Sequence, residues 1–275
     1  MRICVLGSGS SGNATYLETE KTKILIDAGL PFLVIASRLA ELGVLAEEID
    51  AILLTHAHID HIRSIGTFER KFATPIFAPP GTQKVAMEKL GNYPWNFCKP
   101  EEKFCDIEIQ WFPVPHGDRQ TAGEPVNFVI RSRNVTHAHI TDLGTYTTEM
   151  LEIVKGAESI HVEANYEESI VARKLADPAY AAEWEYLEWV ASSKGHLSNT
   201  QCSDFLSMVT TQKTRHVFLA HLSENHEEPD KDNNSFAVAR KKVAQRLKAL
   251  RLKPELHRTY RRGATEGKKS DVVQI

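Results

Sequence analysis

Short apolar runs alternate along the chain with stretches in which apolar residues recur every three or four positions. The runs are typical of strands, and the spaced positions are typical of amphipathic helices. Strands are predicted at 3–6, 23–26, 49–54, 75–78, 107–114, 126–130, 135–140, 159–162 and 217–220. Helices are predicted at 31–42, 62–72, 81–90, 146–154, 168–175, 180–192, 199–209 and 235–252. The order indicates an α/β (α+β) chain, and the absence of repeats or linkers predicts one domain over residues 1–275.

Polar side chains recur where these predicted strands end. His56, His116, Asp142 and His221 each lie within a residue or two of the end of an apolar run. Strand ends lie side by side at one edge of a sheet, and a rigid core can hold such groups around one site. His116 or His221 alone would be read as an ordinary histidine. The shared position predicts a ligand set.

The segment His56-Ala57-His58-Ile59-Asp60-His61 is a compact group of metal-binding side chains. In extended chain, His56 and His58 point the same way and can share one ion. Asp60 and His61 are adjacent, so a turn must direct them toward a neighbouring ion. Nitrogen and carboxylate donors without thiolate suit Zn²⁺ and equally Mn²⁺. Two such ions, about 3.5–4 Å apart, can bridge a water and lower its pKa toward neutrality.

A second histidine pair precedes Asp142 but lacks the adjacent Asp-His of the first segment. His137 and His139 are two apart in a predicted strand, so they share one face. We interpret them as ordinary strand residues. No setting comparable to the first segment surrounds His161, His216, His226 or His257.

Composition narrows the class of protein. The chain has 275 residues, of which 42% are hydrophobic and 25% charged, as in soluble globular proteins. No apolar stretch approaches membrane-spanning length, and the start of the chain lacks the pattern of a signal peptide. The four cysteines show no CxxC spacing, so we interpret them as reduced thiols. These features predict a cytoplasmic protein with no membrane partner.

The net charge of −3 conceals a basic C-terminal region at about 235–275. Residues 240–269 contain twelve Lys or Arg and two Glu. The predicted helix at 235–252 offers an apolar face of Phe236, Val238, Ala239, Val243, Leu247 and Leu250. The basic residues are either a solvated helix face and tail or an electrostatic track for a polyanion.

The strand-end residues resemble the ligand set of the metallo-β-lactamase fold, a four-layer αββα sandwich with metals at strand ends between two sheets. The resemblance implies one metal held by His56, His58 and His116, and a second held by Asp60, His61 and His221. It further implies that Asp142 bridges both ions and that Asp27 orients the cluster.

Three further motifs narrow the resemblance. The loop 7–13, GSGSSGN, has amides and hydroxyls that can cradle a phosphate. The segment 195–199, GHLSN, places His196 near a predicted helix N-terminus, a favourable position for a phosphate. With the 163–167 segment EANYE and a late HLS, the chain resembles the YycJ-like (WalJ-like) bacterial 5′-to-3′ exonucleases. Glu167 stands where Asp is more usual, and residues 177–190 fit the family less well.

The resemblance implies a di-metal phosphodiesterase, most favourably a 5′-to-3′ exonuclease on DNA rather than RNA, with a role in DNA repair. A metal-bridged hydroxide would attack phosphorus. Asp60 and His196 are the expected catalytic residues, with His196 contacting the phosphate or protonating the leaving oxygen. The residues expected to hold a terminal 5′-phosphate are Ser8, Ser10, Ser11, Asn13, Asn165 and His196.

Two other classes of function remain open. One is a small-molecule metallo-hydrolase acting on a cyclic phosphodiester, lactone or thioester, because the fold hosts many chemistries. The other is a non-catalytic, metal-stabilised nucleic-acid-binding protein. The charge of the site favours an anionic substrate. Two divalent ions carry +4, and Asp60, Asp142 and a bridging hydroxide together carry −3, which leaves a net positive charge.

Overall fold

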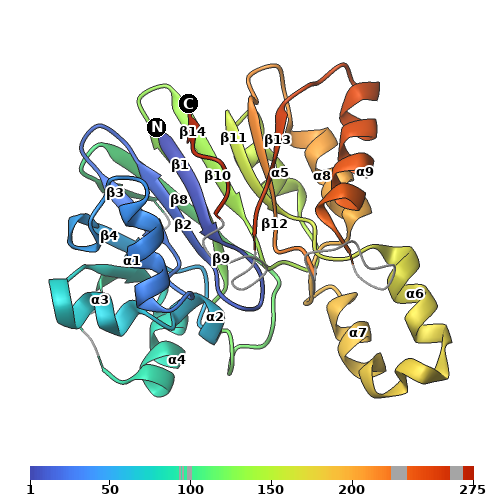
Figure 1. Cartoon of the computed structure of the whole chain (residues 1–275), viewed down its shortest axis with the longest axis horizontal. Helices are drawn as coiled ribbons and strands as arrows, with labels where there is room; N and C mark the ends of the chain where they lie inside the picture. Colours follow the sequence, from blue (N-terminus) through green and yellow to red (C-terminus); the bar gives the residue numbers. More distant parts are fainter. Residues whose placement is uncertain (93, 95, 98–100, 224–233, 261–268) are drawn as a thin grey trace. The chain divides into compact units, whose positions relative to one another are not determined.

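The computed structural model describes residues 1–92, 94, 96–97, 101–223, 234–260 and 269–275. Cys98, His226 and the part of the predicted basic tail at 261–268 lie outside these residues. Helices and strands interleave and the strands form two sheets, which confirms the mixed α/β fold (Figure 1). The chain divides into two compact units. Unit 1 is Met1–Pro113, Asp118–Thr136 and Thr259–Ile275, and unit 2 is Val114–Gly117 and His137–Arg258. The expectation of one domain stays a prediction.

Unit 1 contains a seven-stranded sheet with the order β14-β1-β2-β3-β4-β5-β6. Its strands are β1 (Arg2–Gly7), β2 (Ala14–Glu18), β3 (Lys23–Ile26), β4 (Ala51–Leu53), β5 (Ile76–Ala78), β6 (Asn96–Phe97) and β14 (Val273–Gln274). Pairing is antiparallel from β14 to β3 and parallel from β3 to β6. The apolar residues of β1 and β3 are buried, so hydrophobic burial holds the register.

Helices α1 (Phe32–Ala40), α3 (Ile65–Phe72) and α4 (Pro80–Leu90) share the hydrophobic core of this sheet. The predicted helix at 62–72 is instead divided into α2 (Ile59–Ile62) and α3. Ser64 separates them because its amide donates to the Ala28 carbonyl at 2.9 Å and its hydroxyl donates to the Leu30 carbonyl at 2.6 Å. A short 3₁₀ turn, η1 (Ala46–Glu48), precedes β4.

Unit 1 also contains the antiparallel strands β7 (Glu101–Phe104), β8 (Ile107–Pro113) and β9 (Val126–Ser132). The alternation predicted for 107–114 is present in β8, whose residues Ile107 and Ile109 are buried while Glu108 is exposed. Such one-sided burial is typical of an antiparallel sheet with one wet face.

Unit 2 is built on parallel strands in the order β13-β12-β11-β10. They are β10 (Val135–Ile140, of which the last four residues belong to unit 2), β11 (Ser159–Glu163), β12 (His216–Ala220) and β13 (Glu255–Arg258). Every residue of β11 is buried, as expected for a strand in the middle of a parallel sheet. Parallel strands end at the same edge, so this order brings the ends of β10, β11 and β12 together.

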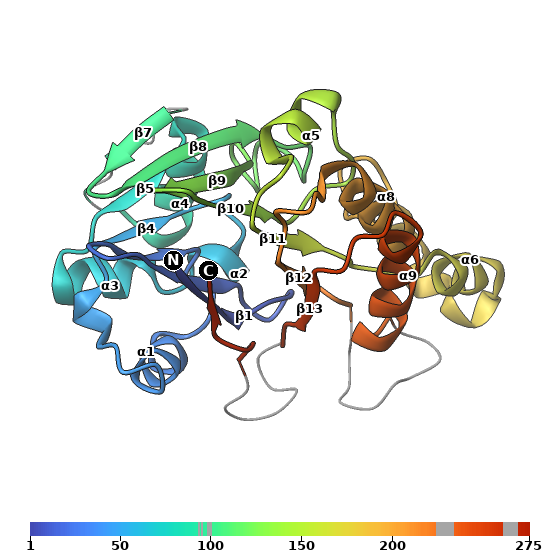
Figure 2. The ribbon, with the colours of Figure 1, turned by 90° about the horizontal axis from the view of Figure 1, so that it is seen from above.

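The helices of unit 2 are α5 (Thr148–Val154), α6 (Glu168–Ala176), α7 (Trp184–Val190), α8 (Asn199–Val209) and α9 (Phe236–Ala249), with a 3₁₀ segment, η2 (Pro178–Glu183). Helix α8 packs against α9 (Figures 1 and 2), while α6 and α7 form a smaller pair (Figure 1). The pair has its own small core of Tyr166, Val171, Leu187 and Val190. Among the described residues, no helix combines the length and apolar character that a bilayer span requires.

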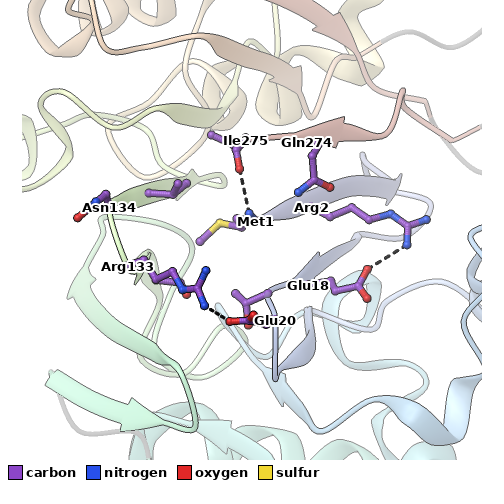
Figure 3. A pocket seen from close by; sticks show the side chains of 11 residues that line it. Met1, Arg2, Glu18, Glu20, Arg133, Asn134, Gln274 and Ile275 are labelled. Carbon is purple, nitrogen blue, oxygen red and sulfur yellow. Dashed lines mark hydrogen bonds and ion pairs between the residues drawn. The ribbon is translucent and has the colours of Figure 1, made fainter.

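A cavity of about 590 Å³, lined by both charged and apolar side chains, lies in unit 1 beside β1, β2 and β14 (Figure 3). Arg2 pairs with Glu18 at 2.9 Å, and Arg133 pairs with Glu20. The Met1 amino group donates to the Ile275 carbonyl at 3.0 Å. Charges around the cavity therefore interact with one another, and none of the predicted site residues lines it.

Candidate metal centre

The segment 56–61 leaves the buried end of β4 and turns at once into α2. His58 is extended, with φ −67° and ψ 148°, and α2 begins at Ile59. This places His56 and His58 before the turn and Asp60 and His61 within it, as the spacing predicts. His56 Nε2 lies 2.9 Å from His58 Nδ1, and His61 Nε2 lies 3.6 Å from Asp60 Oδ2. Unit 1 thus gathers three histidines and a carboxylate in one small volume.

Gly29 allows α2 to lie directly against the end of β3. A Cβ atom at this position would lie 1.5 Å from the Asp60 carbonyl oxygen. Two backbone hydrogen bonds of 2.8 Å stabilise this contact: the Asn13 amide donates to the Asp60 carbonyl, and the Ala28 amide donates to the His61 carbonyl. Only glycine permits this approach, so the Asp-Ala-Gly segment after β3 positions the ligand-bearing turn.

Asp27 is buried and fixes the orientation of His61. Its Oδ2 accepts from His61 Nδ1 at 2.7 Å and from the Thr55 hydroxyl at 2.8 Å, while its Oδ1 accepts from the Thr55 amide at 2.9 Å. Burial raises the pKa of Asp27, although the neighbouring His61 acts to lower it. Because Nδ1 of His61 faces Asp27, the opposite ring nitrogen, Nε2, faces Asp60. A carboxylate on one ring nitrogen is how proteins orient a metal-binding histidine.

In unit 2, four side chains from different strand ends and loops converge. Asp142, Glu163, His196 and His221 are all buried, and each offers one ligand atom within 4.8 Å of the others. Asp142 Oδ1 lies 3.5 Å from His221 Nε2 and 3.8 Å from His116 Nε2. Asp142 and His221 follow β10 and β12, and Glu163 is the last residue of β11, so the sheet order explains how these sequence-distant groups meet.

Glu163 is a site residue that the sequence prediction missed. Its Oε1 accepts from His196 Nδ1 at 2.6 Å and from His221 Nδ1 at 2.9 Å. Burial by itself would raise the pKa of Glu163, but the charges and hydrogen bonds of the two histidines lower it. The available signal was its position: Glu163 ends β11, as His56, Asp142 and His221 follow other strands.

His116 is held as a neutral ligand-type histidine. Its Nδ1 donates to the Gly195 carbonyl at 2.9 Å, which directs Nε2 toward Asp142. Burial lowers the pKa of His116. Metal-binding histidines must be neutral, so this environment favours the required form.

Three residues at these strand ends have left-handed backbone conformations. Asp27, Asp142 and His221 have φ values of 60°, 52° and 49°. Such values are uncommon outside glycine, and Asp and His tolerate them better than most residues. They turn the chain sharply as the strand ends. Backbone strain of this kind clusters at functional sites.

His196 lies two residues before Ser198, the N-cap of α8. Its amide donates to the Val190 carbonyl at 2.9 Å. Ser198 caps α8 by accepting from the Gln201 amide, and the Gln201 side chain accepts from the Ser198 amide at 2.9 Å. The segment GHLSN is therefore a helix-capping turn that also carries a site histidine.

Apart from His196, the residues predicted to hold a phosphate are two buried asparagines, which bond ligand-bearing segments, and three serines, which differ in exposure. Asn13 is buried; its Oδ1 accepts from the Gly9 amide at 2.8 Å, and its Nδ2 lies 3.3 Å from Asp60 Oδ2. Asn165, also buried, donates to the His221 carbonyl at 2.8 Å. Ser8 is buried, Ser11 is half-buried and Ser10 is exposed. The two asparagines thus support ligand-bearing segments, and their phosphate-binding role stays a prediction.

The remaining described histidines fall into two groups. His137, His139 and His161 are buried within strands, and the rings of His139 and His161 stack at 4.1 Å. His216 and His257, on neighbouring strands, approach to 3.0 Å, and Glu255 Oε2 lies 3.6 Å from His216. The pairing of β12 with β13 brings these three side chains together, but the Glu255 carboxylate is exposed, and the interpretation of His216 and His257 as histidines outside the metal site stays a prediction.

Comparison with known proteins matches residues 22–222 to the Beta-lactamase superfamily domain. The exodeoxyribonuclease YycJ of Bacillus anthracis is 32% identical over 252 residues, which cover 90% of this chain and 89% of the relative. The exodeoxyribonuclease WalJ of Streptococcus pneumoniae serotype 2 is 34% identical over 254 residues, covering 90% and 88%. The metallo-beta-lactamase fold protein YhfI from Bacillus subtilis superposes with a TM-score of 0.67 at 15% identity, covering 94% and 96%.

Proposed function

We propose that this chain, which belongs to the metallo-β-lactamase superfamily and within it to the family of the YycJ and WalJ exodeoxyribonucleases, is a metal-dependent 5′-to-3′ exonuclease acting on DNA. The observation that carries the proposal is the paired arrangement of histidine and buried carboxylate. Asp27 orients His61 in unit 1, and Glu163 orients His196 and His221 in unit 2. Such pairs are typical of catalytic metal centres.

The donor set fits divalent metal ions. Ligands bound at about 2.0–2.2 Å to one tetrahedral ion lie roughly 3.3–3.6 Å apart. The separations of 2.9, 3.6, 3.5 and 3.8 Å within the two units fall around this value. We propose that two ions, Zn²⁺ or Mn²⁺, are bound by His56, His58, Asp60, His61, His116, Asp142 and His221.

When bound, the ions would supply an activated hydroxide and stabilise charge on the phosphoryl oxygens. The carboxylate of Asp60, at the start of α2, would accept a proton from the attacking water or hold it in line. Glu163 keeps a proton on His196 Nδ1, so Nε2 is the ring atom that contacts the phosphate or exchanges a proton with the leaving oxygen.

The Ser8, Ser10 and Ser11 hydroxyls would hold a terminal 5′-phosphate, with Asn13 and Asn165 supporting them. Asn13 links this loop to Asp60, so phosphate binding and metal binding would occupy neighbouring groups of unit 1. DNA is the favoured polymer because both curated relatives are exodeoxyribonucleases. Cytoplasmic DNA repair is the setting in which we expect the enzyme to act.

The decisive measurement is nucleotide release from DNA and RNA with defined 5′ ends, in the presence of Mn²⁺ or Zn²⁺. We expect mononucleotides to leave stepwise from the 5′ end of DNA, and His61→Ala or Asp60→Ala to abolish release. Met208→Ala, on the exposed face of α8, serves as a control with full activity. Turnover of a lactone or cyclic phosphodiester without release from DNA would refute the proposal.

A further inference from the structure

Helix α7 carries two aromatic side chains on its surface. Tyr186 is 60% exposed and Trp189 is 37% exposed. They lie three residues apart, so they are neighbours on the helix. Their rings are inclined by only 26°, with centroids 6.1 Å apart. Leu187 and Val190 are the residues by which α7 packs into the small core of unit 2. The exposed rings of Tyr186 and Trp189 are not part of that core.

Trp189 lies directly beside two site histidines of unit 2. The rings of Trp189 and His196 form an edge-to-face pair with centroids 5.3 Å apart and an angle of 86°. The rings of Trp189 and His116 form a second such pair at 6.0 Å and 61°. Tyr186 extends the aromatic surface from Trp189 along α7.

Gly195 fixes this proximity. A Cβ atom there would lie 2.2 Å from the Trp189 carbonyl oxygen and 2.3 Å from that of Val190. The absence of a side chain lets the end of α7 contact the turn that carries His196. The amide of His196 then donates to the Val190 carbonyl at 2.9 Å. Backbone contacts therefore fix the position of Tyr186 and Trp189 relative to His196.

We propose that Tyr186 and Trp189 form a stacking site for a nucleobase of the DNA, next to the histidine that contacts its phosphate. The proposal rests on the proposed exonuclease function. Stacking on aromatic rings binds single-stranded nucleic acid without regard to sequence, because every base has a π-face. An exonuclease needs this tolerance, since each nucleotide of the strand must occupy the site in turn.

The acidic side chains on α7 favour a nucleobase rather than a phosphate as the group bound beside Tyr186 and Trp189. Glu185 and Glu188 are exposed on the same helix. Their carboxylates would repel the phosphates of the backbone, whereas ring faces attract the uncharged bases. The helix thus offers stacking surface while the phosphate is left to His196 and the metal ligands.

The first test compares two 5′-phosphorylated single strands, one intact and one lacking the bases of its terminal nucleotides. On intact DNA, Tyr186→Ala and Trp189→Ala should each raise KM about tenfold, the effect of losing one stacked base. On the abasic strand the same variants should match the wild type, and Trp189→Phe should restore binding of intact DNA. Tyr180→Ala, an aromatic change on η2, is the matched control.

If Trp189 had a purely structural role, Trp189→Ala would impair hydrolysis of the intact and the abasic strand equally. That outcome would overturn the proposal. A second measurement does not depend on hydrolysis: quenching of tryptophan fluorescence by an unlabelled oligonucleotide. Quenching should be strong in the wild type and largely lost in Trp189→Phe. Quenching without nucleotide release would refute the exonuclease function but support the stacking site. Nucleotide release without quenching or base dependence would refute the stacking site alone.

Discussion

Two buried carboxylates set the orientation of the histidines in this protein. Asp27 holds one ring in unit 1 and Glu163 holds two in unit 2. A buried carboxylate is costly unless it is paired and hydrogen-bonded, so its burial here has a function in positioning. Glu163 is the last residue of β11 and Asp27 directly follows β3, so each carboxylate is fixed to a buried strand.

Replacement of Glu163 by glutamine tests this positioning role. The glutamine side chain would be nearly isosteric but uncharged, so its carbonyl oxygen would accept from His196 and His221 more weakly than the carboxylate oxygen that accepts from both. Loss of such an outer partner typically reduces metal affinity or activity by about 10- to 100-fold. We therefore expect Glu163→Gln to reduce nucleotide release by this factor, measured together with bound metal.

Glu108→Gln is the control, because the exposed Glu108 pairs with Lys103 at 2.9 Å rather than with a site histidine. Equal effects of the two substitutions on nucleotide release would show that Glu163 has no special positioning role.

The buried histidine His137 predicts a loss of stability in acid. Burial lowers the pKa of His137 to about 3 from an ordinary 6.5. The folded state keeps the ring neutral, while the unfolded chain takes up a proton below pH 6.5. The contribution of His137 to the free energy of unfolding is therefore complete above pH 6.5 and falls toward pH 3, by about 1.4 kcal/mol per pH unit.

His137→Asn should make the free energy of unfolding less dependent on pH between 7 and 5, as measured by urea titration. Asparagine cannot take up the proton and can still bond the Ser159 hydroxyl, which lies 3.1 Å from His137 Nδ1. Some dependence should remain because burial also lowers the pKa of His161 to about 3. An unchanged pH dependence would contradict the assignment.

The elements were predictable from sequence where they carry a strong apolar pattern. The strands at 3–6, 23–26 and 217–220 and the helix at 199–209 occur close to their predicted bounds. Strand β13 has the sequence ELHR and no apolar run, so only its pairing with β12 makes it a strand. In α9 the buried stripe is Ala239, Val243 and Leu247, while Val238 and Leu250 are exposed.

The basic face of α9 is partly engaged within unit 2. Lys242 pairs with Glu167 at 2.8 Å, and Arg246 pairs with Asp204 at 3.0 Å. These contacts join α9 to α6 and α8, which favours a structural role for at least these two charges. Arg240, Lys241 and Lys248 are exposed, and an electrostatic track for DNA through them stays a prediction.

The cap of α8 links helix stability to the site. Ser198→Ala removes the hydroxyl that accepts from the Gln201 amide at 3.1 Å and should lower the free energy of unfolding by about 1 kcal/mol. Because the cap lies two residues after His196, we expect the same change to lower kcat.

Thr147→Ala, at the cap of α5, is the matched control. It removes a similar bond of 3.3 Å to the Met150 amide and should destabilise comparably without lowering kcat. Thermal unfolding and nucleotide release together separate the two effects. Equal losses of kcat in both variants would argue against a positional link between the α8 cap and His196.

For the chain as a whole, the sequence predicted a set of ligands but not which strands would pair. Strand β14 joins β1 across nearly the full length of the chain, and β13 follows β12 after α9. Such pairing depends on non-local burial, which no local pattern contains. Glu163 was missed for a related reason, since its partners His196 and His221 are distant in sequence.

Metal binding should stabilise the entire protein. An ion that binds only the folded state adds about 2.7 kcal/mol at 100 times its Kd. In a chain of this size that corresponds to a rise in Tm of roughly 5–10 °C per site. We expect Zn²⁺ or Mn²⁺ added to chelator-treated protein to produce such a rise in scanning fluorimetry.

His61→Ala should reduce this rise in Tm, whereas Met208→Ala should not alter it. A Tm unaffected by either metal would show that the described donors bind no ion in the folded state.

The left-handed conformations of Asp27, Asp142 and His221 have a consequence for the choice of inactive variants. Alanine at these positions would remove a proposed ligand, or in the case of Asp27 the partner of one, and would also add backbone strain of about 1–2 kcal/mol. Asparagine tolerates this conformation, so Asp142→Asn changes the carboxylate with little added strain. For capturing a complex with uncleaved DNA, Asp142→Asn is therefore the better substrate trap, because the protein that holds the strand would remain folded.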